Sequence, residues 1–402
     1  MSATSSCDAI VREALDVSMS CVDGRAIVDL ASLRPIATPY RVDTGLGPSR
    51  GRHGLDPVAA LRNHAAPVAL LDPPRQFDET GRAALAIKVI QLCTGRVPVS
   101  TDVIRDLVEV LRSGYEVRDA PLGASTSCGD VNLGAWILLP LVESGAVTVT
   151  RSPYDTLALL NGPWVASAAL LGALDVLALL RSEWQAGAVG WLRATLPSGA
   201  ATDVQRLWDA RALERLPQEQ PRARLDLHVD LQDLPVSQRL TPQVLQEVDT
   251  RTSVALTAVR TATELSPGSP ELFDTEVVST DGFCSLEVDA AARAIHHVVQ
   301  LMATTCAARI RSYATAATRT TTVEVDGYPS VAQLVKTALI STSLVRSMPA
   351  PAAITTAGAD TEDVALMTVA GLASTHEAFD TLGSILRLER VLLEAVERST
   401  ET

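Results

Sequence analysis

Apolar residues recur at helical spacing along most of this 402-residue chain. From Thr101 to Gly114, aliphatic side chains stand at positions 103, 104, 107, 108 and 111, which lie on one face of a helix. Thr101 is a residue type that caps the N-terminus of helices, and Gly114 is one that ends them. Comparable apolar patterns cover Gly81–Cys93, Ala290–Ile310 and Leu382–Val396. The sequence therefore predicts an all-α fold.

Strand-like runs are few and short. Val147–Thr150 and Thr321–Val325 are the candidates, and aromatic residues make up 3% of the chain. Sheets are enriched in aromatic residues, so this composition disfavours an all-β fold. We expect a long central helical bundle over residues 131–402, preceded by a loop-rich helical region over residues 1–130, within one continuous globular unit.

One segment is apolar enough to be considered as a membrane span. Leu157–Leu180 is mostly aliphatic, but it contains Asn161, Pro163 and Asp175. A charge near the middle of a span is costly, whereas a helix that is buried on all sides in a soluble protein has the same overall composition. We therefore expect a core helix and no membrane partner.

Charge and cysteine content exclude several classes of function. The chain has 34 Lys and Arg against 47 Asp and Glu, a net charge of -13, and no basic run. Nucleic-acid binding depends on clustered basic residues, so we expect no nucleic-acid partner. The six cysteines form no CxxC pair, and the adjacent His296 and His297 would point about 100° apart on a helix. We expect no metal site and no disulfide scaffold, and a cytoplasmic location without a signal peptide.

Short polar segments interrupt the apolar sequence at seven places. They are Tyr40–Gly47, Asn63–Pro67, Gly123–Val131, Leu157–Gly162, Val236–Val244, Asp281–Cys284 and Asp360–Met367. In this order and at this spacing they resemble the motifs of the aromatic amino acid ammonia-lyase and aminomutase family, with histidine ammonia-lyase the nearest member. The resemblance covers nearly all of the chain, which is shorter than the family mainly between Asp130 and Asn161 and at its C-terminus.

The resemblance implies an electrophile that the protein makes from its own backbone. In the family, an Ala-Ser-Gly tripeptide cyclises and loses water to give 4-methylideneimidazol-5-one (MIO), which takes up the substrate amine. The equivalent residues are Ser127, Cys128 and Gly129. Cys128 either loses hydrogen sulfide and gives the same group or stays a thiol, and the β-branched Thr126 before it opposes the tight turn that cyclisation needs. No external cofactor is expected.

The resemblance also assigns roles to single residues. Tyr40 matches the base that removes the substrate β-proton, and Arg239 matches the clamp for the substrate carboxylate, which a guanidinium can bind in two places. Asn161 matches a residue that contacts the electrophile and the substrate. Glu362 matches an acidic residue near the substrate amine.

Three further residues match positions that line the substrate pocket. They are His64, Phe283 and Gln243. Six of these assignments have a structural alternative: a packed aromatic for Tyr40 and Phe283, a buried ion pair for Arg239, and a hydrogen-bonded core residue for Asn161 or His64. A solvated carboxylate at the start of a helix is the alternative for Glu362.

Other positions depart from the family pattern. Val236 stands in place of a Tyr, Gly282 in place of an Asn, and Cys284 and Val364 in place of His. Three hypotheses follow: a lyase or aminomutase for an amino acid or its derivative, an MIO-independent lyase or cyclase of specialised metabolism, and a catalytically silent binding or scaffold protein. The resemblance further implies a homotetramer with sites built from three subunits, which the shorter C-terminus could reduce to a dimer.

Overall fold

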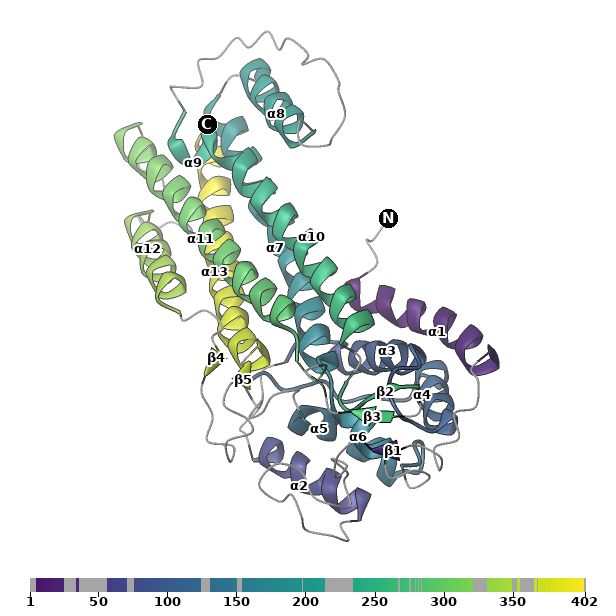
Figure 1. Cartoon of the computed structure of the whole chain (residues 1–402). Helices are drawn as coiled ribbons and strands as arrows, with labels where there is room; N and C mark the ends of the chain where they lie inside the picture. Colours follow the sequence, from purple (N-terminus) through teal and green to yellow (C-terminus); the bar gives the residue numbers. More distant parts are fainter. Residues whose placement is uncertain are drawn as a thin grey trace. The chain divides into compact units, whose positions relative to one another are not determined.

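The computed structural model is predominantly helical, which confirms the predicted all-α class (Figure 1). The structure describes residues 5–24, 34–35, 56–70, 76–123, 131–149, 154–196, 198–213, 234–266, 268–274, 276–278, 280, 282, 284–320, 331–348, 353–354, 365–366 and 368–400. These residues form two compact units with interleaved segments. The first unit comprises 1–175, 254–293 and 350–374, and the second comprises 176–253, 294–349 and 375–402.

The first unit contains the N-terminal helices and the short strands. Its helices are α1 (Ser6–Gly24), α2 (Pro57–Ala69), α3 (Thr80–Cys93), α4 (Thr101–Ser113), α5 (Val131–Glu143), α6 (Asp155–Leu160) and the start of α7 (Trp164–Thr195). The strands are β1 (Arg34–Pro35), β2 (Glu271–Phe273), β3 (Glu276–Val278), β4 (Ala353–Ile354) and β5 (Ala365–Leu366). β3 lies between β1, to which it is parallel, and β2, to which it is antiparallel, and β4 pairs with β5. α1 packs on α3, and α2 packs on α5.

α4 shows how a distant contact sets a helix boundary. The predicted cap at Thr101 is wrong by one residue, because Ser100 is the N-cap, with φ −68° and ψ 140°. Asp155 accepts hydrogen bonds from the Ser100 amide (2.8 Å) and hydroxyl (3.0 Å), which hold Ser100 in its extended conformation. The predicted end is confirmed, since Gly114 has the left-handed φ of 69° that favours glycine.

The strand predicted at Val147–Thr150 is wrong over its described residues. They form a buried loop, in which the Val147 amide donates to Leu141 O (3.0 Å) and the Thr148 amide to Asp106 Oδ2 (3.0 Å). The apolar residues are buried there, but a carbonyl in the last turn of α5 and a carboxylate on α4 accept the backbone hydrogen bonds instead of a neighbouring strand. Thr321–Val325 lies outside the described residues.

The apolar segment considered as a membrane span is broken into two helices. α6 ends before Asn161, α7 begins after Pro163, and Asp175 accepts hydrogen bonds from the Ser6 (2.7 Å) and Cys7 (3.3 Å) amides at the start of α1. Asp155–Thr195 is the one described stretch that is long and apolar enough to cross a bilayer, and 72% of its most apolar window is buried inside the protein. Such burial is what a core helix has.

The second unit is a bundle of long helices. Besides the rest of α7, it draws on α8 (Ser198–Leu213), α9 (Val236–Arg239), α10 (Thr241–Leu265), α11 (Leu286–Thr320), α12 (Val331–Ser347) and α13 (Thr368–Thr400). The predicted apolar face of α11 is confirmed, because Ile295, Val298, Val299 and Met302 are each 0% exposed. The Trp184 indole on α7 donates to Met302 O on α11 (3.0 Å), and Arg181 on α7 pairs with Asp249 on α10 (2.7 Å).

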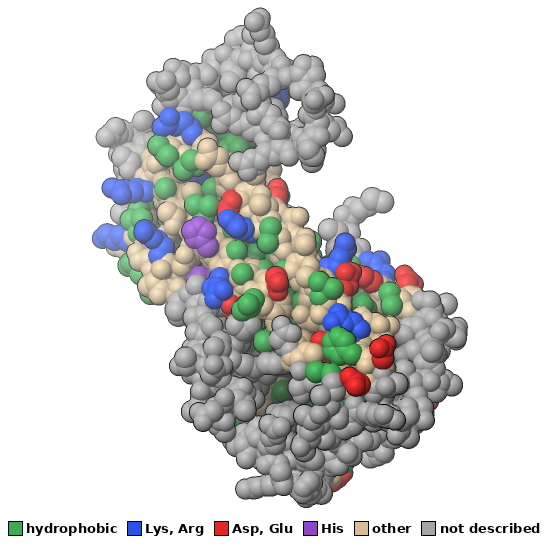
Figure 2. All heavy atoms as spheres, viewed as in Figure 1, with side chains coloured by type: hydrophobic (Ala, Val, Ile, Leu, Met, Phe, Trp, Pro, Cys, Tyr) green, Lys and Arg blue, Asp and Glu red, His purple; other side chains and the backbone are tan. Residues whose placement is uncertain are grey.

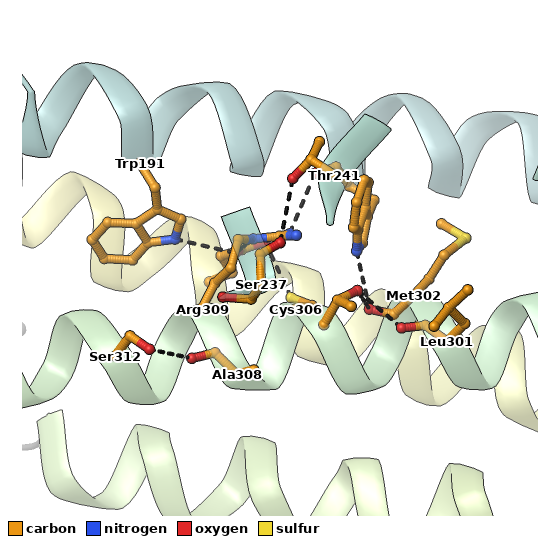
Figure 3. Close-up of polar contacts among 12 residues, drawn as sticks. Trp191, Ser237, Thr241, Leu301, Met302, Cys306, Ala308, Arg309 and Ser312 are labelled. Carbon is orange, nitrogen blue, oxygen red and sulfur yellow. Dashed lines mark hydrogen bonds and ion pairs between the residues drawn. The ribbon is translucent and has the colours of Figure 1, made fainter. Parts of the chain in front are cut away.

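A buried ion pair joins α11 to α13 inside this bundle. Glu389 accepts hydrogen bonds from Arg309 Nε (2.7 Å) and Nη2 (2.9 Å), from the Trp191 indole (3.1 Å) and from the Cys306 thiol (3.1 Å). Figure 3 shows Trp191, Cys306 and Arg309 converging on this point. The Arg309 guanidinium also lies 4.5 Å from the centre of a Trp184 ring. Each side chain of the cluster therefore has an oppositely charged or hydrogen-bonding neighbour.

Candidate functional site

Six of the predicted site residues lie outside the described residues. They are Tyr40, Ser127, Cys128, Gly129, Phe283 and Glu362. Their roles stay predictions. Four others are described: His64 and Asn161 in the first unit, and Arg239 and Gln243 in the second.

Asn161 occupies the turn between α6 and α7. Its backbone is extended, with φ −81° and ψ 150°, and its amide still donates to Leu157 O (3.1 Å). The side chain is 9% exposed, and its Nδ2 donates to Ser269 O at 2.5 Å. Asn161 is therefore a hydrogen-bonded core asparagine, as the structural alternative predicted, through one N–H group of its side-chain amide. The same amide carries a second N–H and an oxygen with two lone pairs.

A fully buried lysine holds the same turn from the other side. Lys88 on α3 is 0% exposed, and its Nζ donates to Ala158 O (3.1 Å) and Asn161 O (2.5 Å). The Trp164 ring centre lies 5.5 Å from Nζ. Burial lowers the pKa of Lys88 to about 7, because removing an ammonium group from water disfavours its charged form. Lys88 thus binds carbonyls that the C-terminus of α6 leaves without helical partners.

The segment after α10 meets Asn161 and carries one of the predicted motifs. Gly282 packs so closely that a Cβ atom at this position would lie 2.6 Å from Gly268 O, and one at Gly268 would lie 3.2 Å from Asn161 O. Gly282 is where the family resemblance places an Asn. The close backbone approach explains the departure, because any side chain at position 282 would collide with Gly268.

A polar chain fixes this segment further. The Thr280 amide donates to Ser269 Oγ (3.1 Å), and the Thr280 hydroxyl donates to Glu271 Oε1 (2.8 Å). Glu271, which is 3% exposed, also pairs with Arg96 Nη2 at 2.5 Å. The described residues of 268–282 are therefore tied both to the turn at Asn161 and, through Arg96, to the loop that follows α3.

The start of α5 is tied to His64. The predicted tripeptide directly precedes this helix, which begins at Val131. His64 on α2 is partly buried and hydrogen-bonds the side chain of Asn132. Burial lowers the pKa of His64, while this hydrogen bond acts in the opposite direction, so a neutral imidazole is favoured near neutral pH.

α5 also contacts the turn that holds Asn161. A Cβ atom on Gly134 would lie 2.8 Å from the Trp164 ring and 3.4 Å from Leu160 O. This glycine lets the first turns of α5 approach the α6–α7 turn. The first unit thus brings together the helix that follows the tripeptide, the Asn161 turn and residues 268–282.

The two described residues of the second unit lie at the end of α9 and in the first turn of α10. Arg239 ends α9 and is exposed, and Gln243 on α10 is exposed as well. The alternative of a buried ion pair for Arg239 is therefore wrong. Val236, where the family has a Tyr, is 57% exposed. Both polar side chains are accessible to a ligand or to another subunit.

Sequence reasoning missed Lys88 and Ser269. Ser269 acts through its backbone carbonyl oxygen, which any residue type would supply. The residue type at position 269 therefore does not indicate this contact. Lys88 did offer one, since it is the charged residue in the apolar run Ala83–Cys93. A lysine in a segment that is otherwise apolar is rarely fully buried without a partner.

Comparisons with known proteins bear on the fold. No protein-family model and no curated protein matches the sequence. Solved structures do match. Phenylalanine aminomutase from Pantoea agglomerans aligns with a TM-score of 0.64 and 17% identity, over 98% of this chain and 85% of that chain. Histidine ammonia-lyase from Trypanosoma cruzi aligns with a TM-score of 0.63 and 18% identity, over 97% and 78%.

The chain has the ammonia-lyase fold. A third protein with this fold is the ergothioneine-degrading ergothionase from Treponema denticola, which aligns with a TM-score of 0.63 and 12% identity over 98% of this chain. The fold expected from the seven polar segments is therefore confirmed. Proteins of this fold act on more than one substrate, so the activity has to be argued from the residues of the site.

Proposed function

We propose that the chain is a divergent ammonia-lyase- or aminomutase-like enzyme. Its substrate is an amino acid or an amino-acid derivative, and its reaction is an elimination across the α,β bond. The observation that supports this most is that three segments which contain or adjoin predicted motifs contact one another in one unit with the ammonia-lyase fold. These are α5, which follows the Gly123–Val131 motif, the turn of Asn161, and the described residues of 268–282, which end at Gly282 of the Asp281–Cys284 motif.

The roles of single residues follow from their chemistry. Tyr40 is the base for the substrate β-proton, and a phenol must be strongly perturbed to accept that proton near neutral pH. Arg239 binds the substrate carboxylate with its fork of N–H groups, and its exposure leaves it free to do so. Asn161 orients the reacting groups with the part of its amide that Ser269 does not occupy. Glu362 lies near the substrate amine.

The pocket is completed by three further residues. His64, Phe283 and Gln243 select the substrate side chain. The neutral imidazole favoured for His64 can either donate or accept one hydrogen bond, so it suits a polar or heteroaromatic substrate side chain better than an anionic one.

The proposed electrophile is the tripeptide Ser127, Cys128 and Gly129. If the tripeptide cyclises, the Gly129 nitrogen attacks the Ser127 carbonyl with loss of water, and Cys128 then loses hydrogen sulfide to leave the methylidene group. MIO would supply an acceptor for the substrate amine. Mass spectrometry of the peptide over residues 121–136 tests this. Loss of both water and hydrogen sulfide supports MIO chemistry, whereas an unmodified, alkylatable Cys128 contradicts it.

A second candidate is an MIO-independent lyase or cyclase. It is favoured by the packing at Gly282, which leaves no room for the Asn that the family has there. A site for MIO chemistry would therefore lack that polar side chain, and pre-placed dipoles supply much of an enzyme's rate. Turnover that is lost in Tyr40→Phe with an unmodified Cys128 supports this candidate. Ligand binding without turnover in either form supports a scaffold protein.

We further propose a cytoplasmic homo-oligomer, a tetramer or a dimer. Apolar side chains are exposed on α12, where Leu339, Ile340 and Leu344 are 39%, 63% and 54% exposed. Figure 2 shows such apolar side chains among charged ones on one face of the protein. A neighbouring subunit could cover them and could supply Arg239 to the site of its partner. Light scattering coupled to size-exclusion chromatography tests the oligomeric state.

A further inference from the structure

Lysine is rare in this chain, and one of its lysines is buried. Lys and Arg together number 34, and Lys88 and Lys336 are the only two lysines in the sequence. Lys336 is exposed on α12, as is usual for this residue type. Lys88 is 0% exposed. A buried amine in a protein that uses arginine almost everywhere else calls for a specific explanation.

α3 presents Lys88 and Gln91 on the same side, because residues three apart on a helix are neighbours. Lys88 donates to Asn161 O (2.5 Å), and Gln91 Nε2 donates to Ser266 O (3.1 Å). These acceptors flank the contact in which Asn161 Nδ2 donates to Ser269 O. One face of α3 therefore holds the chain on both sides of that contact.

A lysine fits this place better than an arginine. The two acceptors are Ala158 O and Asn161 O. An ammonium group has three N–H donors, and the neutral amine still has two, so both protonation states can bind both carbonyls. A guanidinium would bring five donors and a permanent charge into the same buried space.

We propose that Lys88 is a positioning residue of the candidate site. It fixes the turn at Asn161 by binding Ala158 O and Asn161 O. Its consequence for catalysis rests on the proposed function, because that function places Asn161 in the active site. Lys88 is fully buried and acts through Asn161, so it is not itself a catalytic residue. Gln91 supports it by holding Ser266.

Hydrogen exchange of the full-length protein tests whether Lys88 holds the turn at Asn161, and this test does not require a measurable enzymatic activity. Lys88→Met keeps an unbranched side chain but removes the donors. We expect exchange in the peptides over 158–164 and 266–273 to become about tenfold faster or more, since local opening sets these rates. Ile87→Ala is the matched control, because Ile87 is also 0% exposed on α3 and loses packing without losing a hydrogen bond.

The two variants separate positioning from general destabilisation. Faster exchange confined to these peptides in Lys88→Met, and absent from Ile87→Ala at equal thermal stability, supports the proposal. Unchanged exchange in these peptides, or the same increase in both variants, overturns it.

Steady-state kinetics test the catalytic part. We expect Lys88→Met to lower kcat about 100-fold with KM nearly unchanged, because a small misplacement of a reacting group costs about this much. Asn161→Ala should lower kcat similarly, and the double variant should lose little more. If the wild-type protein has no lyase turnover, the proposed function fails, while the exchange data still decide the role of Lys88.

A measurement on lysine-labelled protein covers the case in which Lys88→Met does not fold. The presence of only two lysines gives two side-chain resonances, and Lys336 is an internal control. We expect the Nζ protons of Lys88 to exchange with water about tenfold more slowly than those of Lys336. Asn161→Ala should shift the Lys88 resonance alone. The proposal is overturned if the Nζ protons of both lysines exchange at the same rate, or if Asn161→Ala leaves the Lys88 resonance unchanged.

Discussion

Removing one partner of the Arg309–Glu389 ion pair should destabilise the protein far more than removing both. Both side chains are almost completely buried, at 0% and 1% exposed. Arg309→Met removes two hydrogen bonds to Glu389, of 2.7 and 2.9 Å, and leaves the carboxylate with the Trp191 indole and the Cys306 thiol. An uncompensated buried charge costs about 3–5 kcal/mol, so we expect a loss of this size in the free energy of unfolding.

The double variant Arg309→Met/Glu389→Leu carries no buried charge. Desolvation of the two charges opposes their attraction in the wild-type protein, and apolar replacements of similar volume are often neutral or stabilising. We therefore expect the double variant to lie within about 1 kcal/mol of the wild type, against about 3–5 kcal/mol for each single variant.

Urea unfolding followed by tryptophan fluorescence measures these differences, because Trp184 and Trp191 both contact the cluster. The shift in midpoint multiplied by the slope gives each change in the free energy of unfolding, provided that the slope stays constant. Single variants that each cost less than about 1 kcal/mol would refute the reasoning, since a charge that is not desolvated behaves like a surface ion pair. A double variant whose loss equals the sum of the single losses would refute it as well.

Three further predictions concern the buried groups. Gly134→Ala should cost about 1–3 kcal/mol in thermal or urea unfolding, because its Cβ would lie 2.8 Å from the Trp164 ring, and a wild-type midpoint would contradict this. The free energy of unfolding should rise from pH 7 towards pH 10, by up to about 1.4 kcal/mol per unit, because Lys88 binds its proton more weakly when folded. Lys88→Met should flatten that rise in pH-dependent urea titrations. Cys7 and Cys306 should resist iodoacetamide until the chain unfolds, because burial raises the pKa of both thiols, and rapid native alkylation seen by mass spectrometry would contradict this.

The long helices could be predicted because their cores are periodic. α3, α4, α11 and α13 all contain the predicted apolar stretches. What could not be predicted depends on distant partners. Ser100 is the N-cap of α4 because Asp155, 55 residues away, binds it. The short strands are only two or three residues long, which is too short for an alternating pattern to appear in the sequence.

The candidate site could be predicted only in part for the same reason. Asn161 stands out in the sequence because an amide in an apolar run needs a hydrogen-bond partner. Its partner, Ser269 O, is a backbone atom 108 residues away. The acceptor of Lys88 in the same turn is 73 residues away and is also a carbonyl oxygen. Every residue has a backbone carbonyl, so a backbone acceptor cannot be recognised from residue types. The sequence therefore indicates only the side-chain donor of each contact.

The departure from the family pattern at position 282 is connected with this packing. Gly282 replaces an Asn at a point where a Cβ would lie 2.6 Å from Gly268 O, and Gly268 itself lies against Asn161 O. The residues that hold Asn161 and the residue that departs from the family thus belong to one closely packed region. At position 282, backbone therefore fills the space that the resemblance assigns to an Asn side chain.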